Sequence, residues 1–312
     1  MKKIILLYAA LLLLLPSVTM AEKAPSVVVS IKPIHSLVSG VMEGVASPRL
    51  LVKGGGSPHG YSLRPSEAQA LNRADLIIWV GPELESFLEK PLQTLAKNAQ
   101  QLELSELLKK ALLVKRQGEN WEKPAHHHHE EGEHKVPSDN THNADLHLWL
   151  DPALAKQIVS LSAKALMDLD PGHAEIYQGN AEKMLTKLNQ LDLHLKQKLA
   201  PVKRTPYIVF HAAYQYFESA YGLNAVGSVT IDPERKPGAK KINEIRNKIR
   251  ELKARCVFSE PQFESRLVAT IIEGTGVKTG ILDPLGADLP EGPDAYFQLL
   301  NRLADNLLEG LK

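Results

Sequence analysis

The chain reads "DPGHAEIYQGNAEKMLTKLNQLDLHLKQKLAP" from residue 170 to residue 201, and this stretch separates two halves of similar pattern. Asp170 and Pro171 are typical of a helix N-cap followed by a proline in the first turn, and Pro201 ends the pattern. Between them, apolar side chains recur at helical spacing, at Ile176, Met184, Leu185, Leu188, Leu191, Leu195 and Leu199. A helix of roughly 28 residues is about 42 Å long at 1.5 Å per residue. We therefore expect residues 169–200 to form one long, rigid helix that links two lobes.

Short apolar runs alternate with helical patterns on both sides of the linking helix. Four strands are expected within residues 22–168, at 27–31, 49–52, 76–80 and 101–104. Four more are expected within residues 201–312, at 207–210, 226–231, 256–259 and 278–282. Strands that alternate with helices predict mostly parallel sheets. About 290 mature residues also exceed what one hydrophobic core usually holds. The expected fold is α/β, with two β/α lobes joined by the long helix.

Residues 1–21 have the pattern of a cleavable signal peptide. Lys2 and Lys3 precede an apolar run, and small residues near Ala21 suit cleavage. We therefore expect a periplasmic protein. The single cysteine, Cys256, excludes an internal disulfide and a cysteine-rich zinc module. A formal net charge of +1 with no basic stripe argues against a nucleic-acid partner.

A polar segment without periodicity, residues 115–145, is predicted to be a disordered or mobile loop of the N-terminal lobe. It contains "AHHHHEEGEH" at residues 125–134. Histidine-rich tracts are typical of metal binding, but a loop that must first be ordered binds more weakly than a rigid site. We expect weak, secondary zinc binding by His126, His127, His128, His129 and His134.

A better-ordered site is expected where strands end, because ligands of open α/β sheets bind beyond the carboxyl ends of the strands. His59, His147, His211 and Asp283 occupy such positions in both lobes. Three imidazoles and one carboxylate match the ligands of a tetrahedral zinc ion. Each residue also has an ordinary structural interpretation. His59 lies in a glycine-rich turn, His147 suits a core histidine, His211 a helix cap and Asp283 an Asp-Pro turn.

Five sequence motifs that follow one another in this order favour metal binding over the ordinary structural interpretations of these residues. They are "PHGYSLRPSEAQAL", "ADLHLWLDP", "VFHAAYQYFESAYGL", "CVFSEPQF" and "ILDPLG". With them, the chain resembles the periplasmic zinc-binding proteins of bacterial high-affinity zinc ABC importers over about residues 26–311. The resemblance implies a cluster A-I fold, zinc as the transported ion, and His59, His147 and His211 as ligands.

Two departures from the family pattern affect the expected site. Some zinc-binding members have a glutamate just before the first histidine, where this chain has Pro58. The fourth ligand is therefore expected to be Asp283 or water. Some members have a disulfide in the second lobe; Cys256 matches one half and its partner is absent, so we expect a free, buried thiol.

The resemblance also implies partners, namely an inner-membrane zinc ABC permease with its cytoplasmic ATPase, and we expect the protein itself to be a monomer without enzymatic activity. Two alternatives stay open. A manganese-binding relative or adhesin would have a glutamate where this chain has His211. A secreted zinc hydrolase would need a general base, for which Glu260 is the only nearby candidate, and the chain has no HExxH, GxSxG or phosphate-loop motif.

Overall fold

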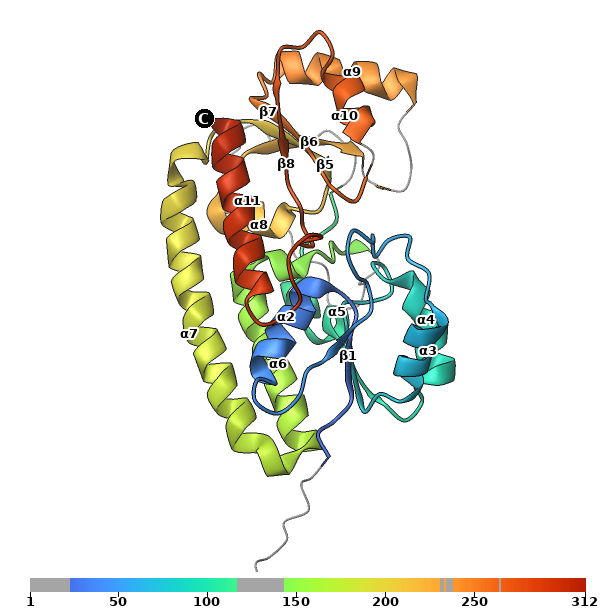
Figure 1. Ribbon diagram of the computed structural model, residues 1–312. Helices are drawn as coiled ribbons and strands as arrows, with labels where there is room; N and C mark the ends of the chain where they lie inside the picture. Colours follow the sequence, from blue (N-terminus) through green and yellow to red (C-terminus); the bar gives the residue numbers. More distant parts are fainter. Residues whose placement is uncertain (1–22, 117–142, 231–232, 234–237, 264) are drawn as a thin grey trace, which may run out of the picture.

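The structure is a computed structural model that describes residues 23–116, 143–230, 233, 238–263 and 265–312. The predicted signal peptide and the histidine run lie outside the described residues. Within them, the chain builds two four-stranded parallel sheets with helices around each (Figure 1). The predicted α/β fold with two β/α lobes is confirmed.

The N-terminal lobe has the strand order β2-β1-β3-β4, and every pairing in it is parallel. Its strands are β1 (Val27–Val29), β2 (Arg49–Leu50), β3 (Leu76–Trp79) and β4 (Gln100–Glu103). The helices of this half are α2 (Lys32–Val41), α3 (Pro65–Asn72), α4 (Ser86–Leu95), α5 (Leu104–Leu107) and α6 (Pro152–Leu169). Apolar side chains under α3 and α4 form a separate small core on one face of this sheet.

The C-terminal lobe repeats the arrangement with the strand order β6-β5-β7-β8. Its strands are β5 (Tyr207–His211), β6 (Ala225–Thr230), β7 (Cys256–Ser259) and β8 (Lys278–Ile281). Its helices are α8 (Gln215–Tyr221), α9 (Ala239–Glu251), α10 (Ser265–Ile272) and α11 (Ala295–Leu311). Cys256 is a free, fully buried thiol, as the sequence predicted.

The largest hydrophobic core runs from one sheet to the other without interruption. It includes Val29 and Ile78 from the first sheet and Val209 and Phe258 from the second. Helices α2, α6, α7 and α11 join these ends, and α11 of the C-terminal half contacts both α2 and α7. The two lobes therefore share one hydrophobic core, into which α2, α6, α7 and α11 pack.

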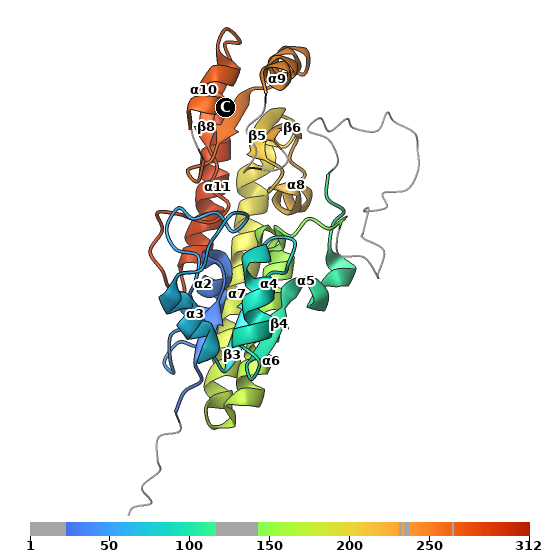
Figure 2. The ribbon, with the colours of Figure 1, turned by 90° about the vertical axis from the view of Figure 1, so that its right-hand side faces the viewer.

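The long helix α7 (Ala174–Leu199) runs beside both lobes and follows a short 3-10 turn (Figures 1 and 2). Most of the predicted apolar stripe is buried, but Ile176 is 43% exposed, so its assignment to the stripe was wrong. Tyr177 is buried in its place. Tyr177, Met184 and Leu191 are seven residues apart, which keeps them on one face, whereas Ile176 lies one residue off that face.

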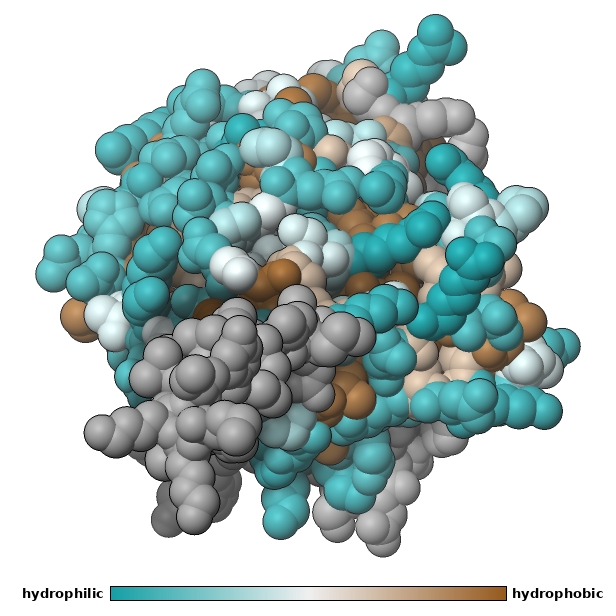
Figure 3. All heavy atoms as spheres, turned by 60° about the horizontal axis from the view of Figure 1, so that its bottom comes forward, coloured by the Kyte–Doolittle hydropathy of each residue, from teal (hydrophilic) through white to brown (hydrophobic). Residues whose placement is uncertain are grey.

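Hydrophilic side chains cover most of the face in Figure 3, with hydrophobic ones in smaller groups between them. The large exposed apolar residues are scattered over several elements: Leu107, Leu169, Ile176, Leu193, Leu252 and Ile281. Among the described residues, none of the helices combines the length and apolar character needed to span a membrane.

Candidate metal centre

Three histidines from separate parts of the chain meet between the lobes. His59 lies in the turn region after β2, His147 lies directly before the 3-10 turn Leu148–Leu150, and His211 is the last residue of β5. Each contributes one ring nitrogen to a group in which all ligand atoms lie within 4.8 Å of one another. His147 and His211 are buried and His59 is partly buried. The structure therefore brings together three of the four residues predicted to bind the metal.

The spacing of the imidazoles suits a small tetrahedral cation. The ring centroids lie 5.2 to 5.6 Å apart. Nε2 of His147 lies 3.3 Å from Nε2 of His211. Two nitrogens bound to zinc at about 2.0–2.1 Å in tetrahedral geometry lie about 3.3–3.4 Å apart. These two nitrogens thus lie at the separation that a tetrahedral zinc ion requires.

Buried carboxylates determine which nitrogen each of these two rings presents. Nδ1 of His147 lies 2.8 Å from Oδ1 of Asp145, and Nδ1 of His211 lies 2.7 Å from Oε1 of Glu260. An ionised carboxylate can only accept a hydrogen bond, so both Nδ1 atoms carry the proton. The Nε2 atoms of the two rings therefore face each other, and each can offer its lone pair to a cation when its ring is neutral.

Burial favours the neutral, metal-binding form of the imidazoles. It lowers the pKa of His59 well below the usual value for histidine, and the neighbouring His147, His211 and Lys115 add to the effect. Burial also lowers the pKa of His147, although the carboxylate of Asp145 opposes the shift. A histidine must be neutral to bind a metal ion, so these shifts keep His59 and His147 able to bind one below the ordinary histidine pKa of about 6.5.

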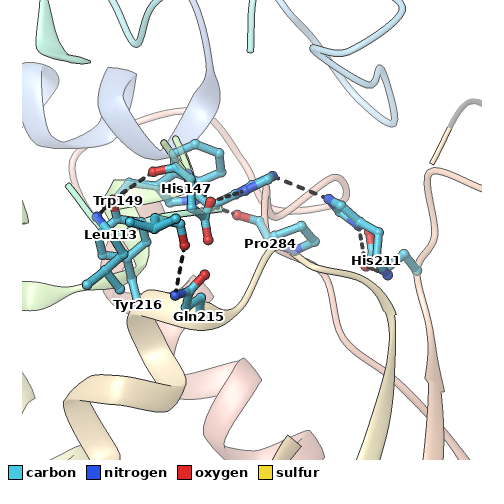
Figure 4. Close-up of polar contacts among 10 residues, drawn as sticks. Leu113, His147, Trp149, His211, Gln215, Tyr216 and Pro284 are labelled. Atoms are coloured by element: carbon cyan, nitrogen blue, oxygen red, sulfur yellow. Dashed lines mark hydrogen bonds and ion pairs between the residues drawn. The ribbon is translucent and has the colours of Figure 1, made fainter. Parts of the chain in front are cut away.

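The walls around the cluster differ on its two sides. A pocket of about 250 Å³ on one side is lined in part by the apolar side chains of Trp149, Phe263 and Leu285. Trp149 is fixed by a hydrogen bond from Nε1 to the carbonyl of Pro284, at 2.8 Å (Figure 4). A second hollow, of about 860 Å³, borders the same three histidines and is lined also by Glu83 and Lys115. The polar hollow offers an ion a route to the imidazoles.

Asp283, predicted as a possible fourth ligand, does not join the three imidazoles in this structure. Its Oδ1 accepts hydrogen bonds from Gln262 Nε2 and from the backbone N–H groups of Leu285 and Gly286, and its Oδ2 accepts one from Ala287 N–H. The carboxylate therefore organises the loop after β8. Of the two alternatives for the fourth position, this arrangement favours water.

Asp145 and the role of Glu260 were missed by the sequence interpretation. The sequence identified Glu260 only as a candidate base, and Asp145 was not singled out. A signal for Asp145 exists in "ADLHLW", because a carboxylate two residues before a ligand histidine can reach its Nδ1. Glu260 lies 49 residues from His211 in the sequence, and only the pairing of β5 with β7 brings them together.

Comparison with known proteins agrees with this geometry. The model of the family described as "ZnuA: Zinc-uptake complex component A periplasmic" matches residues 27–310. The chain belongs to this family. It is 45% identical over 314 residues to the high-affinity zinc uptake system protein ZnuA of Brucella abortus, covering 94% of this chain and 93% of the relative. It is 38% identical over 309 residues to that of Yersinia pestis, covering 97% and 96%.

Solved structures share the fold. A crystal structure of ZnuA superposes with a TM-score of 0.76 at 24% identity, covering 93% of this chain and all of the other. A mutant of the laminin-binding adhesin Lmb from Streptococcus agalactiae superposes with a TM-score of 0.75 at 25% identity, with the same coverage. Two parallel sheets joined by a long helix are thus an arrangement shared by these proteins.

Proposed function

We propose that the protein captures Zn²⁺ between its two lobes and delivers it to an ABC permease for import. The observation that carries the proposal is the pair of Nε2 atoms of His147 and His211, which face each other at 3.3 Å. His59 supplies the third imidazole. Three imidazoles with an open fourth position form an established type of zinc site. Water fills that position in our proposal, because the carboxylate of Asp283 is engaged in its own loop.

The ligand set favours zinc over manganese. Imidazole suits zinc, whereas harder oxygen ligands suit Mn²⁺. Among the structural neighbours, a Zn(II)-bound variant of AdcAII from Streptococcus pneumoniae has a TM-score of 0.71 at 25% identity and supports the same choice. The support for the adhesin alternative among these neighbours is the similarity of the fold to that of Lmb. A titration in which zinc and manganese compete for the site distinguishes the zinc-binding proposal from the manganese-binding alternative.

The family description also supports a place in the periplasm and a larger assembly. The partners we propose are the inner-membrane zinc permease and its cytoplasmic ATPase, with residues 1–21 as a cleavable signal peptide and the mature protein as a monomer. We propose no enzymatic activity. Glu260, the candidate base identified from the sequence, has its Oε1 2.7 Å from Nδ1 of His211, and this contact orients a proposed ligand. Hydrolysis by the zinc-loaded protein would contradict this part of the proposal.

The histidine run keeps a secondary role in the proposal. His126 to His129 and His134 bind zinc weakly and hold it close to the cluster, since residues 116 and 143 flank the segment beside His147. Deletion of residues 120–142 is expected to remove weak binding and retain the tight site. Loss of the tight site in a folded deletion variant would make the run the primary site.

A competition titration with a chromophoric zinc chelator tests the main proposal. The unmodified protein is expected to bind one zinc ion tightly and manganese much more weakly. His211→Ala is expected to lose most of the tight binding, because it removes one of three imidazoles. His194→Ala is the matched control, since His194 is exposed on α7 and is not among the three histidines whose ring nitrogens meet. Equal zinc affinity of the two variants would remove His211 from the proposed site.

A further inference from the structure

Two short segments of the N-terminal half pair beside the metal centre. Residues 113–116 and 143–145 form an antiparallel contact, which we call the stem. The N–H of Lys115 donates to the carbonyl of Asn143 at 2.8 Å, and the N–H of Asp145 donates to the carbonyl of Leu113 at 2.9 Å. The stem therefore ends at Asp145, the residue whose carboxylate orients His147.

Helix α8 of the C-terminal lobe binds both sides of the stem. The hydroxyl of Tyr216 accepts a hydrogen bond from Leu113 N–H at 3.0 Å and donates one to the carbonyl of Asp145 at 2.7 Å. Gln215 Nε2 donates to the carbonyl of Val114 at 3.2 Å. Figure 4 shows Gln215 and Tyr216 reaching from the helix toward these backbone groups. An ion pair between Arg116 and the buried carboxylate of Glu218 adds a third attachment.

The same helix is closely connected to the other lobe's ligand. His211 ends β5, and α8 begins at Gln215, four residues later. On the stem side, Oδ1 of Asp145 accepts from both the N–H and the Nδ1–H of His147, at 3.0 and 2.8 Å. A short route therefore joins the two ligands, from His211 through Tyr216 and Asp145 to His147. The covalent route between them is 64 residues long.

We propose that Tyr216 is a positioning residue that sets the separation of His147 and His211 across the two lobes. This inference rests on the proposed zinc-binding function. The Tyr216 side chain is 3% exposed, and its hydroxyl both accepts and donates within the stem. Removing this hydroxyl leaves the partly buried N–H of Leu113 and the buried carbonyl of Asp145 without that partner, and such groups rearrange to find another one. Asp145 then shifts, and the carboxylate no longer holds His147 opposite His211.

The test compares Tyr216→Phe with Tyr221→Phe in the otherwise unmodified full chain. Both tyrosines are buried on α8, but the hydroxyl of Tyr221 donates to Asp192 on α7 and does not contact the stem. Tyr216→Phe is expected to weaken zinc affinity about tenfold, in the range seen when supporting groups of metal ligands are removed. The visible spectrum of the cobalt(II)-loaded variant is expected to shift, because the ligand geometry changes. Tyr221→Phe is expected to change neither property.

Amide hydrogen exchange of the metal-free variants supplies a readout that does not depend on zinc. Faster exchange at Leu113 and Asp145 in Tyr216→Phe alone is expected. Unchanged affinity and cobalt spectrum in Tyr216→Phe, while the unmodified protein binds zinc tightly, would overturn the inference and leave the proposed function intact. Absence of tight zinc binding by the unmodified protein would overturn the proposed function itself. If Tyr216→Phe does not fold, Gln215→Ala is expected to show the same changes at smaller size, and its failure to do so would equally overturn the inference.

Discussion

At the residue scale, two buried carboxylates outside the three-histidine cluster orient two of its rings. Asp145 and Glu260 each accept the Nδ1 proton of one histidine, so the opposite nitrogen of each ring faces the cluster. Such partners fix the tautomer and the orientation of the ring and raise its basicity. Zinc affinity should therefore respond to these two side chains almost as strongly as to the ligands.

Asp145→Asn is expected to weaken zinc binding by about 10- to 100-fold, because a neutral amide holds the imidazole less firmly than a carboxylate does. Asp168→Asn is a suitable control, since Asp168 is exposed on α6 and pairs only with Lys164 among the contacts described. A chelator competition titration measures both variants. Equal affinities for the two would show that Asp145 does not support the ligand.

A second residue-scale prediction concerns Glu85, which is fully buried and accepts hydrogen bonds from the N–H groups of Val80 and Gly81. Burial raises its pKa from 4.5 to about 7. The folded state therefore binds this proton more tightly than the unfolded chain, so the contribution to stability is present below about pH 4.5 and is lost as pH rises to about 7. The loss amounts to about 3 kcal/mol, at about 1.4 kcal/mol for each unit of pKa.

Glu85→Gln is expected to abolish this decline, since the amide is neutral at every pH. Denaturant unfolding of the metal-free protein at several pH values between 5 and 8 measures the effect. Glu309→Gln, an exposed position on α11, is the control and should keep the decline. A decline of equal size in Glu85→Gln would show that another group is responsible.

The ligands and their partners were not equally accessible from the sequence. His59, His147 and His211 could be identified because they follow predicted strands or lie in the motifs that resemble the zinc-binding family. Asp283 follows a strand as well, but the N–H groups of its own loop satisfy its carboxylate, which no local pattern indicates. The pairing of Glu260 with His211 depends on the register of separate strands and becomes visible only in three dimensions.

At the element scale, periodicity predicted most of the architecture and failed where neighbouring positions compete for one face. Helix α7 buries Tyr177 and exposes Ile176, although both are adjacent in the chain and the aliphatic residue looks more suited to a core. Strand order could not be derived from the sequence, because it depends on which crossovers pack together. The close packing between α11 and β7 could not be predicted from the sequence either. It depends on Gly310, where an added Cβ would lie 2.7 Å from Cζ of Phe258 and 3.0 Å from Sγ of Cys256.

Gly310→Ala is expected to destabilise the protein by about 1–3 kcal/mol, the usual cost of overfilling a packed core. The matched substitution is Gly179→Ala in α7, where the added Cβ would have no heavy atom within 4 Å beyond its own helix backbone and chain neighbours. That variant should be more stable by about 0.5–1 kcal/mol, because alanine loses less conformational freedom in a helix than glycine does. Thermal unfolding of the metal-free proteins measures both, and a stabilised Gly310→Ala would contradict the packing described here.

At the scale of the whole molecule, several contacts besides α7 hold the lobes together. The buried ammonium of Lys32 in α2 donates to three carbonyls of the loop after β8, those of Gly286, Ala287 and Leu289, at 2.6 to 2.9 Å. The hydroxyl of Tyr296 in α11 donates to the carbonyl of Trp149 at 2.8 Å. These contacts, together with the shared core, oppose a wide hinge motion.

Small-angle scattering of the metal-free and zinc-loaded protein is therefore expected to give nearly the same radius of gyration. Metal release should involve local shifts around the cluster and a modest tilt of the lobes. A large decrease of the radius on zinc loading would show a hinge closure and would contradict this expectation.

X-ray absorption at the zinc edge tests most directly whether three imidazoles from both lobes bind the ion. With one equivalent of zinc, we predict nitrogen or oxygen neighbours at about 2.0–2.1 Å in four-coordinate geometry, with the outer-shell scattering of three imidazoles. The His211→Ala protein should lose one of them. A spectrum dominated by carboxylate oxygens, or one that is the same in His211→Ala, would contradict the account.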